Sequence, residues 1–132
     1  MKFILSILVL AFAAILACGG SSEPSNSSTL SPSVKELAIE SIKGYSEVFD
    51  AAITQDGRKL SLVVIVGCAT SDAVAKDMGD NFVRMVKSFG PEPAPTKEIG
   101  KGDFDYLVGV YCAGDKQIAL GAKNRNSTRI NW

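Results

Sequence analysis

The chain has 132 residues, and its 14 basic side chains balance its 14 acidic ones. This balance argues against nucleic acid or a strongly anionic surface as a partner. Histidine is absent from the sequence, which excludes Ser-His-Asp and Cys-His nucleophilic sites and the common histidine-bearing zinc sites. Catalysis by this chain would therefore depend on carboxylates, lysines or hydroxyls.

Residues 1–17 have the features of an export signal. Lys2 gives a positive start, and residues 3–17 form an apolar run that only Ser6 interrupts. A run of roughly 15 apolar residues is shorter than the length needed to cross the hydrocarbon core of a bilayer, and it matches the apolar centre of an export signal. The sequence therefore predicts a protein that leaves the cytoplasm.

The leader ends on an aliphatic residue, a tolerant position, a small residue and a cysteine: Ile15, Leu16, Ala17 and Cys18. This segment resembles the lipobox of bacterial lipoproteins, and the resemblance covers only the leader and Cys18. It implies that residues 1–17 are cleaved, that Cys18 carries diacylglycerol through a thioether, and that its new amine can take a further acyl chain such as palmitate. Two or three acyl chains together anchor a protein stably in a membrane.

Gly19 follows the cysteine, where an aspartate in this family can retain the protein at the inner membrane. The resemblance therefore implies a lipid anchor in the outer membrane if the cell has one, and otherwise on the outer face of the cell membrane. Ordinary secretion and an uncleaved membrane anchor are the alternatives.

Residues 18–33 consist of the lipidated cysteine and a serine-rich segment that contains Pro24 and Pro32. Such a composition buries too little apolar surface to offset the entropy of ordering, so we expect a flexible tether. Residues 34–132 are enough for a single small domain.

The first half of this domain reads as a helix and a hairpin. Apolar residues at helical spacing between Val34 and Tyr45 predict a helix that Ser33 caps and Gly44 ends. Alternation over residues 49–54 and turn chemistry over residues 55–58 predict a hairpin, whose second strand spans residues 60–66. Because residues 62–66 are all apolar, either both faces of this strand are covered by the chain or one exposed face meets a partner.

The second half repeats this order. A long helix over residues 71–89 has an apolar stripe, with Ala75 and Val86 beside it; the stripe consists of Val74, Met78, Phe82, Met85 and Phe89. An extended connection over residues 91–102 leads to strands over residues 104–110 and 118–122, and residues 128–132 could add an edge strand. The order helix–hairpin–helix–hairpin predicts an α+β fold, a two-layer sandwich of two helices and about four to five strands. If adjacent, the strands that flank the long helix would run parallel.

Cys68 and Cys112 are the cysteines left once Cys18 is lipidated. Each follows the end of a predicted strand, and in the parallel arrangement these ends are neighbours. In an oxidising compartment we expect a structural disulfide between them. Two unpaired thiols or a redox-active pair are the alternatives, although the chain has no Cys-x-x-Cys motif.

Two pairs of acids and one group of bases could bind a ligand. Asp77 and Asp80 share a helix, and Asp103 and Asp105 flank one strand position, so either pair could hold a hard cation or share acid–base chemistry. Solvated faces of amphipathic elements explain both pairs as well. A strand edge protected by charge, or a small anion site, explains the basic residues of the C-terminal part: Lys116, Lys123, Arg125 and Arg129.

These observations favour a lipid-anchored protein of the cell envelope with a non-enzymatic binding or structural domain, without metal or cofactor. Its expected contacts are the membrane, through Cys18, and an envelope protein or a second copy of the chain. Two alternatives remain open: a small envelope redox protein or carboxylate-dependent enzyme, and a small-ligand sensor with its pocket between the sheet and the helix of residues 71–89.

Overall fold

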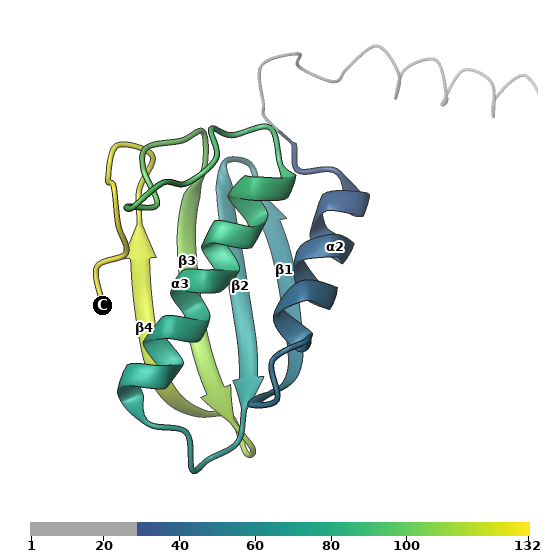
Figure 1. Cartoon of the computed structure of the whole chain (residues 1–132), viewed down its shortest axis with the longest axis vertical. Coiled ribbons are helices and arrows are strands. Elements are labelled where there is room, and N and C mark those ends of the chain that lie inside the picture. The colour runs from purple at the N-terminus through teal and green to yellow at the C-terminus, as the bar shows by residue number, and fades with distance from the viewer. Residues whose placement is uncertain (1–28) are drawn as a thin grey trace, which may run out of the picture.

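The computed structural model describes residues 29–132, so the predicted leader, Cys18 and most of the predicted tether lie outside the described residues. Two helices and a four-stranded mixed sheet confirm the α+β class (Figure 1). In chain order the elements are α2 (Pro32–Lys43), β1 (Val48–Asp56), β2 (Lys59–Val66), α3 (Asp72–Phe89), β3 (Asp105–Cys112) and β4 (Lys116–Lys123).

The folded part begins before residue 34, where the sequence analysis placed the end of the tether. Leu30 is buried in the core, and its backbone N–H donates to the Gln55 side-chain oxygen at 3.0 Å. Ser31, instead of Ser33, caps α2 by accepting a hydrogen bond from the Val34 amide. An apolar anchor and a cap therefore tie the start of α2 to the sheet.

The four strands are arranged in the order β1-β2-β3-β4. β1 pairs with β2 and β3 pairs with β4 in antiparallel hairpins, whereas the central strands β2 and β3 run parallel. A parallel pair needs a crossover connection, and α3 provides it. In Figure 1 both central strands point downward, so the upper end of the sheet is where β2 and β3 begin and the lower end is where they finish.

The core lies between the helices and one face of the sheet. β2 alternates strictly, with Leu60, Leu62, Val64 and Val66 fully buried. In Figure 1 α3 crosses in front of the sheet and α2 lies beside it over β1. Helix side chains that complete the core include Ala38, Ile42, Phe82, Val83 and Val86.

The predicted apolar stripe of α3 is wrong at both ends. Val74 and Phe89 are 37% and 42% exposed, whereas the centre of the stripe, Met78 and Phe82, is buried as predicted. Ala75, predicted beside the stripe, and Gly79 are buried as well. The prediction followed the large side chains, but the helix turns a face with small residues toward the sheet, which allows a close approach of the two backbones.

The Trp132 ring lies between α3 and β4, in the space left by Gly79 on the helix and Gly121 on the strand. A Cβ atom on Gly79 would come within 2.5 Å of the Trp132 ring, and one on Gly121 within 2.6 Å. Asn131 forms a single antiparallel bridge with Ala122, which is the observed extent of pairing in the predicted edge strand of residues 128–132. Helix, sheet and indole therefore fit together only with glycine at both positions.

Gly79→Ala should destabilise the protein, although alanine normally stabilises a helix by about 1 kcal/mol relative to glycine. The added Cβ would also lie 2.9 Å from Val108, and overpacking of this kind costs about 1–3 kcal/mol. Chemical denaturation of the purified full chain measures the change. Ser88→Ala, at an exposed position of the same helix, is the control and should change stability by less than about 0.5 kcal/mol. A Gly79→Ala variant as stable as the parent would contradict the packing described here.

Candidate functional site

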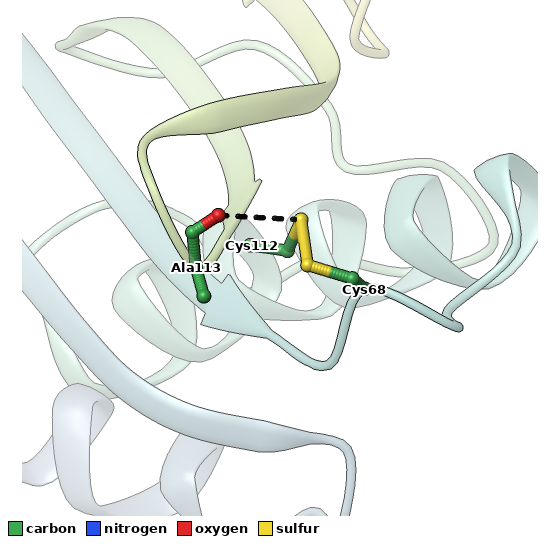
Figure 2. Close-up of a disulfide and its surroundings, with 3 residues drawn as sticks. All are labelled: Cys68, Cys112 and Ala113. Atoms are coloured by element: carbon green, nitrogen blue, oxygen red, sulfur yellow. Dashed lines mark hydrogen bonds between the residues drawn. A yellow bond between two sulfur atoms is a disulfide. The ribbon is translucent and has the colours of Figure 1, made fainter.

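Cys68 and Cys112 form a disulfide, as predicted, with their Cα atoms 5.0 Å apart (Figure 2). The parallel pairing of β2 and β3 brings the exits of both strands to the lower end of the sheet, so the two cysteines meet there. The bond joins residues separated by 44 positions, and the chain-entropy estimate gives about 4 kcal/mol for a loop of this size. The Cys112 sulfur also lies 4.0 Å from the Ala113 carbonyl oxygen; since a bonded sulfur carries no hydrogen, this is a packing contact.

The acids singled out in the sequence are each engaged with a different neighbour. Asp105 accepts a hydrogen bond from the Arg125 amide at 2.9 Å, and Asp80 pairs with Arg84 at 2.6 Å. Asp77 and Asp103 are exposed. Residues 29–132 contain no group of three or more acids or cysteines placed to hold a metal ion. The structure therefore does not bring these carboxylates together into one site.

The basic residues of the C-terminal part are also separated. Lys116 and Lys123 begin and end β4 and so lie at opposite ends of the sheet. Lys123 is buried, Arg125 lies 3.8 Å from Asp105, and Arg129 lies 4.0 Å from Glu98. The alternative of a small anion site is therefore not assembled from these four side chains.

A buried polar cluster that the sequence analysis missed holds the long connection after α3. We call it the loop clasp, and it consists of Lys87, Glu92, Tyr106 and Lys123. Glu92 accepts hydrogen bonds from the Tyr106 hydroxyl and from the Asp103 amide. Lys87, which the sequence placed near the end of α3, is buried and donates to the carbonyls of Gly100 and Lys101 at 3.2 and 2.8 Å.

The electrostatics of the loop clasp follow from its burial. Burial, then the hydrogen bond and charge of Glu92, raise the pKa of Tyr106 far above its ordinary value. Burial and the nearby Lys87 lower the pKa of Lys123, whose ammonium lies 5.8 Å from the centre of the Tyr106 ring. Within the described part of the chain, no buried side-chain nitrogen or oxygen lacks a hydrogen-bond partner. Because its buried polar groups are all hydrogen-bonded, the loop clasp holds the connection between α3 and β3 against the upper end of the sheet.

The second face of the sheet is opposite the helices and carries a different surface, which we call the open face. The residues of each strand that alternate with the buried ones point this way. The middle of this face is apolar across three strands, and none of its apolar members is fully buried: Val63, Ile65, Leu107, Tyr111, Leu120 and Ala122. Polar residues border it toward the upper end and on β1, among them Ser61, Lys59 and Asp56. Of the two interpretations of the apolar run over residues 62–66, the structure supports the one with an exposed face.

Aromatic rings rest on glycines along this surface. A Cβ on Gly109 would come within 2.5 Å of the Tyr111 ring, so this ring lies along its own strand over the bare glycine. At the lower end, the ring of Phe49 lies 3.6 Å from where a Gly67 Cβ would be, and Phe49 is 68% exposed. The glycines therefore let aromatic side chains lie low against the sheet and contribute flat apolar area.

A shallow hollow of about 220 Å³ marks the upper part of the open face over β3. Its lining comes from three neighbouring strands and the residue after β4: Lys59, Asp105, Tyr106, Leu107, Ala122, Lys123 and Asn124. The third predicted possibility, a pocket between the sheet and α3, falls in a region filled by the buried side chains of Met78 and Phe82.

None of the helices within residues 29–132 is both long and apolar enough to cross a membrane. No protein family, curated protein or solved structure matches the chain. The interpretation of the site therefore rests on the geometry alone.

In Tyr106→Phe, the free energy of unfolding should fall less steeply with rising pH above pH 10 than it does in the parent. Because folding raises the pKa of Tyr106 above its unfolded value of 10.0, its contribution is complete below pH 10 and is lost as the pH rises further. The loss approaches about 1.4 kcal/mol per pH unit in the parent. Denaturation curves up to about pH 11 measure it. Equal slopes in the parent and the variant would contradict a buried, neutral Tyr106, since all other titrating groups are common to both.

Proposed function

We propose that this protein is a lipid-anchored component of the bacterial cell envelope whose domain binds another protein through the open face. In this proposal Cys18 carries the anchor, and the domain forms one helix layer and one sheet layer. The partner covers the face of the sheet that residues 29–132 leave open. The domain acts by binding, without catalysis or a cofactor.

The observation that carries the proposal is the contrast between the two faces of the sheet. Val64 and its core-side neighbours are fully buried under α2 and α3, while Ile65 and the rest of the open face are partly exposed. A contiguous apolar surface that polar residues border is typical of an interaction site. Each apolar Å² that a partner covers contributes about 25 cal/mol, which gives a driving force for docking.

Two features favour a protein partner over a small ligand. The open face is a broad sheet surface with a shallow hollow, whereas small-molecule sites are concave and bury most of the ligand. Its aromatic members, Tyr111 and Phe49, belong to the residue types that are enriched at protein interfaces.

The alternative functions have less support. A redox role would require the Cys68–Cys112 bond to open, and this bond ties the ends of the two central strands together. A carboxylate-dependent enzyme would require two acids that converge, whereas Asp105 and Asp80 are each held by a different arginine.

Leu120→Glu should remove the complex without unfolding the domain, because Leu120 is 42% exposed on the edge strand β4. Full-length protein extracted from membranes in mild detergent is compared by native electrophoresis. The parent should migrate as a complex larger than one chain, and Leu120→Glu should migrate as a single chain.

Leu37→Glu is the matched control, since Leu37 is 49% exposed on α2, on the helix side of the domain. This variant should keep the complex. Mass spectrometry of the parent should find acyl groups on the peptide that begins at Cys18, and Cys18→Ser should remove them. A Leu120→Glu variant that migrates like the parent would contradict binding through the open face, and an unmodified Cys18 in the parent would contradict the anchor.

A further inference from the structure

We propose that the upper end of the domain docks on a membrane surface with anionic lipid headgroups, with the strands roughly perpendicular to the membrane. The inference rests on the anchor in the proposed function, because Cys18 holds the domain beside the bilayer. It adds which end of the domain faces the lipid, and it leaves the open face turned sideways toward a partner.

The folded part of the chain begins at the upper end of the sheet. The Leu30 amide donates to Gln55 near the end of β1, and α2 begins two residues later at Pro32 (Figure 1). Thr29 lies 11 positions after Cys18, and a chain of that length spans at most about 40 Å. An anchor on Cys18 therefore keeps the upper end near the lipid at a high effective concentration.

Three segments meet at this end, and we call them the upper rim: residues 56–59, 90–105 and 124–132 (Figure 1). Backbone hydrogen bonds join the last two, because the amides of Gly100 and Gly102 donate to the carbonyls of Thr128 and Arg125. Each segment contributes exposed bases: Arg58, Lys59, Lys97, Lys101, Arg125 and Arg129.

The upper rim has an excess of positive charge. Outside the loop clasp its acids are Asp56, Glu98, Asp103 and Asp105, of which Asp105 and Glu98 pair with Arg125 and Arg129. The first turns of α2 add one base and one acid, Lys35 and Glu36, and the loop clasp adds two lysines against Glu92. Within residues 29–132 no ion pair involves the remaining bases of the rim, so these are available to lipid phosphates: Arg58, Lys59, Lys97 and Lys101.

The lower end of the domain has the opposite sign. Its bases are Lys43, Lys76 and Lys116, and the first two pair with Asp50 and Asp72. Its exposed acids are more numerous: Glu47, Asp50, Asp72, Asp77 and Asp115. The balanced charge of the whole chain argued against an anionic partner, but the fold separates the charges. An anionic membrane therefore attracts the upper end and repels the lower end.

An exposed aromatic side chain lies where the folded chain begins. Phe89 ends α3 and is 42% exposed, and a Cβ atom on Gly90 would come within 3.2 Å of Leu30. Further exposed apolar residues follow: Pro91, Pro93 and Ala94. Basic side chains beside an aromatic ring are typical of surfaces that lie at the boundary between headgroups and acyl chains. A soluble polyanion would leave these apolar groups in water, so the combination favours a bilayer.

The test uses Phe89→Trp in the full chain, reconstituted in vesicles whose acyl chains carry bromine, which quenches indole fluorescence on contact. In vesicles of phosphatidylcholine and phosphatidylglycerol the added tryptophan should be quenched beyond the background of Trp132 in the parent. It should not be quenched in phosphatidylcholine alone, and high salt should relieve the quenching. Val74→Trp, at a position 37% exposed near the lower end, is the matched control and should be quenched in neither.

Lys97→Gln and Lys101→Gln, each in the Phe89→Trp chain, should lower the ratio of docked to undocked protein about fivefold, because a base near an anionic surface contributes about that factor. Both lysines contribute only backbone carbonyls to the hydrogen bonds of residues 29–132, so these bonds are kept. Lys116→Gln, the same change at the lower end, should have no effect.

Three results would overturn the docking: no quenching of Phe89→Trp, equal quenching of it in the two kinds of vesicle, or equal quenching of Val74→Trp. The mass of the Cys18 peptide is measured on the same sample. The quenching decides the docking and the mass decides the anchor, so the inference and the proposed function can fail separately.

Discussion

The parallel pairing of β2 with β3 is the constraint on which the rest of the structure depends. Neighbouring parallel strands need a crossover, and α3 makes it on a single face of the sheet. The same pairing leaves β1 and β4 as edge strands in antiparallel hairpins and brings the strand exits together, where Cys68 and Cys112 are bonded. The loop clasp holds the other end of the crossover: Lys87 and Glu92 bind the connection that returns the chain to β3. The central pair is thus fixed at both of its ends.

Because both helices pack on one face of the sheet, the side chains of the central strands decide whether the opposite face is polar or apolar. β2 and β3 are apolar at most positions, which suits strands covered on both sides. In this domain only one side is covered within residues 29–132, so Ile65 and Tyr111 remain accessible. Of the candidate acids, Asp80 and Asp105 are held in single ion pairs, while Asp77 and Asp103 are exposed. The account therefore assigns function to an apolar surface instead of a cluster of reactive groups.

Patterns that depend on local spacing predicted the fold well. The apolar run over residues 62–66, the apolar spacing over residues 71–89 and the strand-end positions of the cysteines led to the central strand, the long helix and the disulfide. Contacts between distant segments were not predictable: Lys87 looks like a helix-end cation, and Glu92 lies in a proline-rich stretch without periodicity. The large residues of α3 predicted the buried face correctly at Met78 and Phe82 but not at Val74 and Phe89, and the contact of Gly79 with Trp132, far apart in the chain, was not predictable. The apolar run raised the possibility of an open face, but only the topology shows on which side of the sheet both helices pack.

The most direct measurement is footprinting of the full chain with a carbene reagent, once in intact membranes and once in detergent, diluted until native electrophoresis shows a single chain. The account predicts that Tyr111 and Leu120 are labelled weakly in membranes and strongly after dilution. Leu37 and Val74, exposed on the helix side, should be labelled to the same extent in both. Equal labelling of Tyr111 and Leu120 under the two conditions would mean that the open face faces solvent in the membrane, and the central claim would be wrong.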